Sequence, residues 1–237
     1  MRCPFVVKEL ASGNAFMRYD ASVITQPHVG LFDPGHAALD ARPVSEGGRQ
    51  AAWYVRCGSH DAVLRHYRRG GLAAKVSSRH YVFMGLSHAR SLNEFDVLRM
   101  LYEAGLPVPR PLAAIVWKHG LTYRAALIVE RLHEVSALAS CLDVADSEQV
   151  ARAIYAMHEQ GVWHADLNAY NILLDKEGRA WLIDFDKARR MVLSLERRSA
   201  NLLRLRRSLA KVAGAQGITW WDDLNRHYTR LTRAVGM

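Results

Sequence analysis

Four polar side chains within residues 164–186 have the types and spacing that phosphate chemistry requires. His164 and Asp166 begin a short polar loop, Asn171 ends it, and Asp184 lies 13 residues further along the chain. Carboxylate and amide oxygens are ligands that suit Mg²⁺, a hard cation that also binds phosphate oxygens. These residues therefore indicate a metal-assisted reaction, provided that the fold brings them together.

A β-hairpin is the element that would bring them together. Two apolar runs, residues 171–175 and 180–183, are separated by a turn that contains Gly178. Two short apolar runs joined by a glycine-containing turn are typical of a hairpin. The loop before the first strand would then lie close to the end of the second, so Asp166 and Asp184 would converge.

The spacing His-x-Asp-x-x-x-x-Asn, followed by an apolar strand and Asp-Phe, resembles the catalytic and metal-binding loops of the protein-kinase-like superfamily. The resemblance implies that Asp166 accepts the proton of the attacking hydroxyl. It also implies that Asn171 and Asp184 hold Mg²⁺ on the phosphates of ATP, with ATP and Mg²⁺ as cofactors. His164 would be a structural residue that braces the loop.

Two positions depart from the protein-kinase pattern. Asn168 stands where protein kinases usually carry Lys, and Asp186 stands where the third residue of Asp-Phe-Gly would be Gly. Both departures point to a kinase of a small molecule or lipid. No long activation segment ending in Ala-Pro-Glu is present either.

Composition describes an ordinary folded protein with an excess of positive charge. The chain has 237 residues, of which 50% are hydrophobic and 23% charged, and its formal net charge is +9. This excess favours an anionic partner. Three widely spaced cysteines predict reduced thiols in a cytosolic setting. The first residues lack the apolar core of a signal peptide, and no run approaches the length of a membrane span.

A glycine pair upstream is the candidate phosphate-covering loop. Gly47 and Gly48 precede a strand-like run at residues 51–55. Glycine lacks a Cβ and lets the backbone approach phosphates closely, although a bland turn is the alternative. In the kinase-like fold such a loop covers ATP.

Two residues are candidates for the basic residue that contacts the phosphates. Arg65 lies on the second strand-like run, residues 62–67, where the superfamily carries Lys. Arginine also neutralises phosphate, but its planar fork differs from a compact ammonium. Lys75 is the alternative, and strand position favours Arg65.

A helix over residues 91–101 carries the acidic residue that would pair with this cation. Ser91 and Glu94 fit a capping box, and Gly105 fits the helix end. Glu94 either caps its own helix or is the acidic partner of the basic strand residue, as the resemblance implies.

The C-terminal half is predicted to be mostly helical. A helix over residues 146–160 buries one apolar face, and His158 on it receives no chemical role. Residues 187–211 are strongly basic, with interleaved leucines that predict a partly buried helix. A further helix over residues 219–235 is predicted to begin with a capping box of Thr219 and Asp222.

These elements predict an α+β, two-lobed protein-kinase-like fold. Residues 1–131 would form an N-terminal lobe with a small antiparallel sheet, a Gly-rich loop and one helix. Residues 132–237 would form a mostly helical C-terminal lobe with the catalytic and metal-binding loops. Residues 1–48 show no long periodic pattern, because prolines and glycines interrupt them, and short strands or a partly mobile arm are the two alternatives there.

A narrower resemblance covers residues 47–211. The strings VLRHYRRGGLAAK, GLPVPRPLAA, HADLNAYNILLD and WLIDFDKA are similar to the 3-deoxy-D-manno-octulosonic acid (Kdo) kinases of the lipopolysaccharide kinase family. The resemblance implies transfer of the ATP γ-phosphoryl group to a hydroxyl of the Kdo sugar on lipid A precursor. It also implies work at the cytoplasmic face of a Gram-negative inner membrane. Membrane contact would be peripheral, with Arg189, Arg190, Arg197 and Arg198 as candidates.

Three alternatives remain open. A kinase of another small molecule, such as an aminoglycoside, would line its acceptor pocket with acids, which the basic tail disfavours. A catalytically inactive kinase-like binding protein is disfavoured by the intact Asp166, Asn171 and Asp184. A nucleic-acid partner is not expected, because charge without a recognised binding motif is only an electrostatic footprint.

Overall fold

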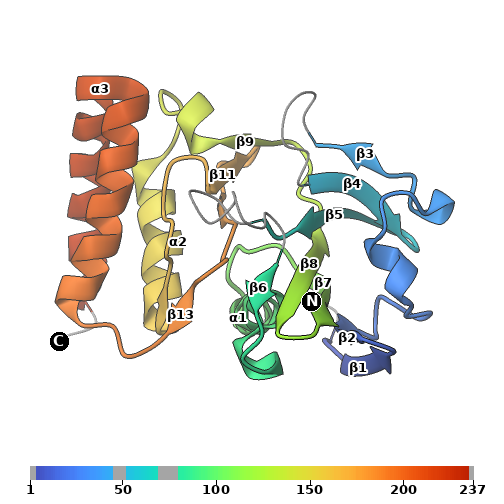
Figure 1. Cartoon of the computed structure of the whole chain (residues 1–237). Helices are drawn as coiled ribbons and strands as arrows, with labels where there is room; N and C mark the ends of the chain where they lie inside the picture. The colour runs from blue at the N-terminus through green and yellow to red at the C-terminus, as the bar shows by residue number, and fades with distance from the viewer. Residues whose placement is uncertain (1–3, 45–51, 69–79, 235–237) are drawn as a thin grey trace. The chain divides into compact units, whose positions relative to one another are not determined.

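The computed structural model describes residues 4–44, 52–68 and 80–234 and has an α+β architecture (Figure 1). It divides into two compact units, Met1–Arg99 with Arg110–Arg131 and Met100–Pro109 with Leu132–Met237. The first unit is built on an antiparallel sheet and the second is largely helical. The predicted fold class, a sheet-rich N-terminal part followed by a helical part, is confirmed.

The sheet of the first unit has eight strands in the order β1-β2-β7-β8-β5-β4-β3, with β6 on the edge of β8. All of its pairings are antiparallel. The strands are β1 (Val7–Ser12), β2 (Ala15–Asp20), β3 (Arg42–Pro43), β4 (Ala52–Cys57), β5 (His60–His66), β6 (Tyr81–Val82), β7 (Pro111–His119) and β8 (Thr122–Glu130).

The two faces of this sheet are covered differently. Side chains alternate along a strand, so Leu64 and Arg65 of β5 point to opposite faces. Leu64 is fully buried in a core that includes Phe32 and Leu39, from the 3-10 helices η1 (Val29–Phe32) and η2 (Ala37–Leu39). Arg65 faces helix α1 (Arg90–Glu103), where Glu94 lies.

Helix α1 does not begin with the predicted capping box. The helix starts at Arg90, and the hydroxyl of Ser91 donates to the carbonyl oxygen of Ile115, at 2.9 Å. Glu94 uses its carboxylate for Arg65 and Tyr67 instead. The side chains therefore tie the helix to the sheet rather than cap it.

The second unit combines two helices with short strands. Asp146 caps α2 (Ser147–Glu159) by accepting a hydrogen bond from the backbone N–H of Glu148, and the predicted apolar face of α2 is buried. The strands are β9 (Val135–Ala137), β10 (Val162–Trp163), β11 (Ile172–Asp175), β12 (Ala180–Leu182) and β13 (Arg189–Arg190), and η5 (Leu138–Ser140) follows β9.

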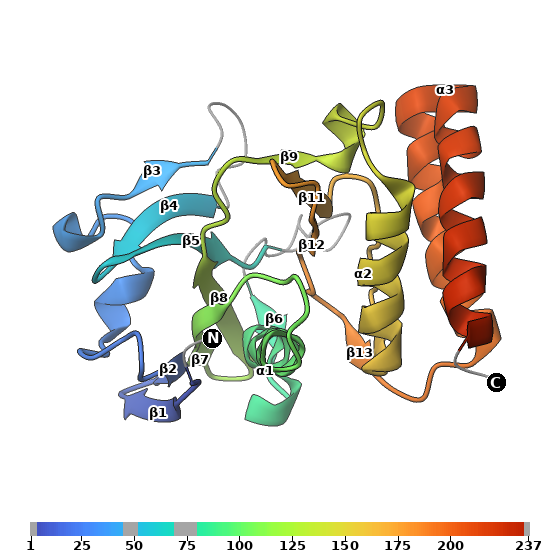
Figure 2. The same cartoon turned by 180° about the vertical axis from the view of Figure 1, so that it is seen from behind.

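Helix α3 (Leu195–Ala234) folds back on itself as two arms that lie side by side (Figures 1 and 2). The break is at Ala213 and Gly214, and Gly214 has a φ of 54°, which glycine adopts without strain. A Cβ at Gly217 would lie 2.3 Å from the carbonyl oxygen of Leu209, so the arms can approach closely only with glycine there.

The predicted helix start at Thr219 is wrong, because Thr219 lies inside the second arm and its hydroxyl donates to the carbonyl of Ala215. Hydrogen bonding across the arms is provided by Trp221, whose indole N–H donates to the carbonyl of Leu202. Among the described residues, no helix combines the length and apolar character that crossing a membrane requires.

Candidate active site

The predicted hairpin is present and sets the position of the site. Strand β11 pairs antiparallel with β12, with Ile172 opposite Leu182. The N–H of Ile183 donates to the carbonyl of Asn171 at 3.1 Å. The start of β11 and the end of β12 are therefore neighbours, and each leads into a candidate segment: the loop with Asp166 on one side and Asp184 on the other.

His164 fastens the loop to the end of β12. Its Nδ1 accepts a hydrogen bond from the backbone N–H of Asp166 (3.2 Å), and its Nε2 donates to the carbonyl of Ile183 (3.0 Å). Burial lowers the pKa of His164, which is the expected result of desolvating a cation. The ring also packs on Phe185, with centroids 4.8 Å apart. A neutral imidazole thus holds both segments.

Two amides fix the backbone of the loop. Asn171 and Asn168 both donate from Nδ2 to the carbonyl oxygen of Asp166, at 2.9 and 3.1 Å. In the described part of the chain, nothing donates to Oδ1 of Asn171, which leaves that oxygen as an acceptor. Asn168, a departure from the protein-kinase pattern, is therefore a structural residue of this loop.

Asp184 has a left-handed backbone with a φ of 62°. Non-glycine residues adopt this region uncommonly, although Asp tolerates it better than most. Such backbone strain clusters at active sites and ligand clamps. The amide oxygen of Asn171 and the carboxylate of Asp184 make an all-oxygen donor pair, which fits Mg²⁺ shared with phosphate oxygens.

A second hydrogen-bond network links the loop to helices α2 and α3. Buried Asn201 on α3 donates from Nδ2 to the carbonyl of His164 (2.7 Å), and its Oδ1 accepts from the N–H of His164 (3.2 Å). The same Oδ1 accepts from Nε2 of His158 (3.1 Å), and Tyr228 donates to Nδ1 of His158 (2.6 Å). Burial lowers the pKa of His158 to about 4. His158 thus braces the loop as a neutral group.

Asp166 differs from its neighbours because its side chain is half exposed. Its Oδ1 accepts two hydrogen bonds from Arg204, at 2.6 Å from Nη2 and 3.1 Å from Nε. The exposed fractions are 50% for Asp166 and 44% for Arg204. Within the described residues, Oδ2 of Asp166 accepts no hydrogen bond.

Sequence reasoning missed how α3 contributes to this loop. Asn201, Arg204 and Ser208 recur at helical spacing, and each contacts the loop: Ser208 accepts from the N–H of Ala169 at 3.1 Å. The signal was a polar stripe at i, i+3 and i+7 inside a run that its charge made conspicuous.

In the first unit, the structure pairs Arg65 with Glu94. Nη2 of Arg65 lies 2.6 Å from both carboxylate oxygens, and the Tyr67 hydroxyl also donates to Glu94. The Glu94 side chain is 2% exposed and that of Arg65 28%. Three predicted site residues, Gly47, Gly48 and Lys75, lie outside the described residues.

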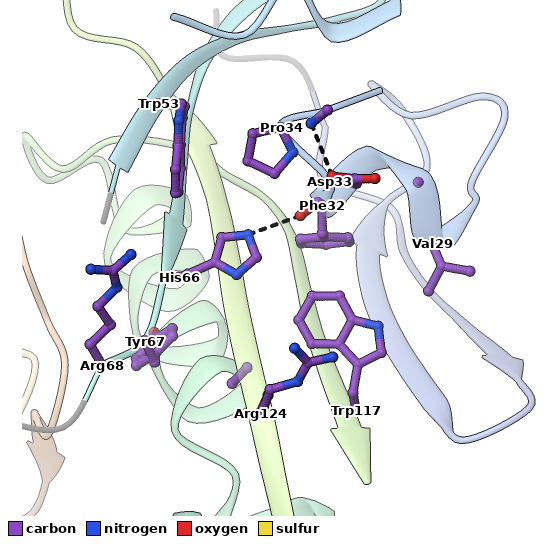
Figure 3. A pocket seen from close by; sticks show the side chains of 13 residues that line it. Val29, Phe32, Asp33, Pro34, Trp53, His66, Tyr67, Arg68, Trp117 and Arg124 are labelled. Carbon is purple, nitrogen blue, oxygen red and sulfur yellow. Dashed lines mark hydrogen bonds between the residues drawn. The ribbon is translucent and has the colours of Figure 1, made fainter. Parts of the chain in front are cut away.

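A cavity of about 640 Å³ lies on the other face of the same sheet (Figure 3). His66 stacks on Trp117 with centroids 6.0 Å apart and hydrogen-bonds the carbonyl of Phe32 at 2.9 Å. Trp53 and Arg124 also line the cavity. Among the described residues, no predicted site residue lines this cavity, and Arg65 points to the opposite face of the sheet.

Comparison with known proteins agrees with the resemblance seen in the motifs. The model of the "Lipopolysaccharide kinase (Kdo/WaaP) family" matches residues 36–231. A 3-deoxy-D-manno-octulosonic acid kinase of Stenotrophomonas maltophilia (strain K279a) is 45% identical over 223 residues, which cover 92% of this chain and 88% of that protein. A kinase of the same name from Xylella fastidiosa (strain M23) is 44% identical with the same coverage. Another from Xanthomonas campestris pv. campestris (strain B100) is 44% identical over 226 residues, 94% of this chain and 90% of that protein. The chain therefore belongs to the lipopolysaccharide kinase (Kdo/WaaP) family.

Proposed function

We propose that this protein is an ATP- and Mg²⁺-dependent kinase that phosphorylates a hydroxyl of the Kdo sugar on lipid A precursor, in the biosynthesis of the lipopolysaccharide inner core. One observation carries the proposal: a half-exposed carboxylate, Asp166, stands on a loop whose backbone is otherwise locked by buried polar groups. Relatives that match over nine-tenths of the chain are named as kinases of this sugar acid.

Asp166 is the general base of the proposed reaction. A base must reach the proton it removes, at about 2.6–3.2 Å between heavy atoms. Its Oδ2 is available for the acceptor hydroxyl while Oδ1 is held by Arg204. The proton of the hydroxyl passes to Asp166 as the oxygen attacks the γ-phosphorus of ATP, and ADP leaves.

Asn171 and Asp184 would hold Mg²⁺, which neutralises phosphate charge when ATP is bound.

Arg65 is the proposed phosphate-neutralising residue of the first unit, and Glu94 holds it in place through both carboxylate oxygens. We expect Arg65→Ala to raise the KM for ATP, or to lower kcat, far more than Lys75→Ala. Equal or reversed effects would assign the phosphate contact to Lys75.

Contact with the inner membrane is proposed to be peripheral and to occur at its cytoplasmic face. Arg189 and Arg190 are exposed on β13, close in sequence to Val192 and Leu195, which are 96% and 69% exposed. Exposed basic and apolar groups together suit an anionic lipid surface. Arg198 is a weak candidate, because it pairs with Glu159 at 2.6 Å and its side chain is only 16% exposed.

The function is tested by incubating the protein with labelled ATP, Mg²⁺ and Kdo-bearing lipid A precursor. An aminoglycoside and an unrelated protein serve as parallel acceptors. We expect label on the lipid alone and none with Asp166→Ala. Label on another acceptor would retain the kinase and replace its substrate, whereas ATP binding without any transfer would indicate a kinase-like binding protein.

Membrane contact is tested separately by co-sedimentation with vesicles. We expect the protein to bind vesicles that contain anionic phospholipid and to leave neutral phosphatidylcholine vesicles unbound. Charge reversal by Arg189→Glu and Arg190→Glu should weaken this binding. Binding that is indifferent to lipid charge and to these substitutions would overturn the proposed surface.

A further inference from the structure

The ion pair between Arg204 and Asp166 uses only part of each side chain. A guanidinium has five N–H groups arranged as a rigid fork. Nε and Nη2 of Arg204 both point to Oδ1 of Asp166. In the described part of the chain, Nη1 of Arg204 donates to no other group. One end of the guanidinium therefore remains available beside the candidate base.

Among the described residues, Arg204 is the basic side chain of its helix arm that pairs with the loop. Three neighbours have other partners: Arg197 contacts Met191, Arg198 pairs with Glu159, and Arg206 lies over the ring of Trp221. Arg207 is exposed and has no ion pair with the loop among the described residues. The guanidinium of Arg204 is therefore the positive group that this arm places against the candidate base.

The proposed substrate supplies a matching group. The sugar of the named relatives is an acid, and a carboxylate is the planar anion that an arginine fork binds best. An exposed fraction of 44% for Arg204 leaves room for such a ligand. A substrate-binding guanidinium that also holds the base would fix two points of the acceptor at once.

We propose that Arg204 binds the carboxylate of the sugar acid through Nη1 while Nε and Nη2 remain on Asp166. This inference rests on the proposed function. One guanidinium then bridges the base and the substrate. The reacting hydroxyl must reach Oδ2 of Asp166, so it belongs to the same sugar as the carboxylate. Acceptors without the acid lose this anchor, which makes Arg204 a specificity-determining residue.

The test compares two acceptors in two enzymes: Kdo-bearing lipid A precursor and the same lipid with its Kdo carboxylate converted to a carboxamide. For the wild type we expect kcat/KM to be about 10- to 100-fold higher on the acid, the usual range for a charged hydrogen-bonded contact. In Arg204→Ala this preference should fall to less than about threefold. Arg204→Lys should keep little of it, because an ammonium cannot bridge two groups in the same plane.

Arg207→Ala is the matched control, since it removes an exposed arginine three residues away on the same arm. It should retain the wild-type preference.

If Arg204→Ala slows both acceptors equally, or retains the preference for the acid, the carboxylate assignment is overturned. An equal loss of preference in Arg207→Ala would also overturn it, in favour of diffuse positive charge. These outcomes differ from failure of the proposed function, in which the wild type phosphorylates neither lipid. Circular dichroism of each variant confirms folding, and Arg204→Gln provides a second neutral variant.

Discussion

The two units each contain an arginine–carboxylate pair, and the pairs differ in their access to water. Arg65 and Glu94 have side chains that are 28% and 2% exposed, whereas those of Arg204 and Asp166 are 44% and 50% exposed. A buried pair leaves an uncompensated charge when one partner is lost, and that costs about 3–5 kcal/mol. An exposed pair contributes about 0–1 kcal/mol. Loss of the first pair should therefore destabilise its unit, whereas the second pair contributes little to stability and is accessible to a ligand.

The largest effect is expected from Asp166→Asn, which keeps the shape of the exposed partner and removes its basicity. We predict a fall in kcat of about 10²- to 10⁴-fold, the usual contribution of a general base. Stability should change little, because the side chain is half exposed. Single-turnover phosphate transfer measures the rate, and Asp143→Asn, an exposed carboxylate outside the site, is the control. A variant that retains more than a tenth of the wild-type rate would remove Asp166 from the role of base.

Arg65→Ala tests the buried pair through stability. We predict a loss of about 3 kcal/mol in the free energy of unfolding, at the low end of the range for a broken buried pair. The Tyr67 hydroxyl still donates to Glu94 and limits the loss. Urea unfolding provides the measurement. The control, Arg56→Ala, removes an exposed pair with Asp61 at 3.9 Å and should cost less than about 1 kcal/mol. Equal losses in both variants would contradict the contrast between buried and exposed pairs.

The network under the loop should make stability depend on pH. Burial lowers the pKa of His158 from 6.5 to about 4, so unfolded chains bind a proton in this window that folded chains do not. The contribution of His158 to the free energy of unfolding should therefore be fully present above pH 6.5 and be lost as the pH falls towards 4. The expected loss is roughly 3 kcal/mol, at about 1.4 kcal/mol per pH unit.

His158→Gln should flatten part of this dependence, measured as the urea midpoint at pH 7 and pH 4.5. Some dependence should remain, because burial lowers the pKa of His164 as well. An unchanged difference between the two midpoints would show that His158 does not stay neutral in the folded protein.

The smallest effect on stability is expected for Arg204→Ala, which breaks the exposed pair. We predict a change below about 1 kcal/mol, despite a large loss of preference for the acid substrate. Thermal unfolding of the variant beside Arg207→Ala provides the measurement. A loss comparable to that of Arg65→Ala would mean that Arg204 is a structural residue rather than a substrate contact.

Local sequence patterns were enough to predict the hairpin and the loop before it. The register of β11 and β12 follows from two short apolar runs and one turn, and the spacing of His164, Asp166 and Asn171 is itself local. The Gly13-Asn14 turn was a local signal for the hairpin of β1 and β2. The hairpin was nevertheless not predicted, because apolar and polar residues alternate only weakly along its two strands.

Contacts made through tertiary packing could not be predicted from the sequence. Asn201 lies 37 residues from His164, and Tyr228 lies 70 residues from His158. The periodicity of a helix shows which of its faces is buried, but not which distant loop that face will contact. For the same reason the sequence did not predict the pairing of Arg204 with Asp166, because Arg204 is one of several arginines in a basic run.

The doubled-back helix α3 has a consequence for how the protein is made. Tyr228, on the second arm, completes the hydrogen bonds that run through His158 and Asn201 to the loop. A ribosome delivers that arm well after the loop itself, and contacts of long sequence separation form slowly. The nascent chain therefore carries the loop of Asp166 without the contribution of Tyr228 until the second arm has emerged and docked, and this hydrogen-bond network is complete only after synthesis has passed Tyr228.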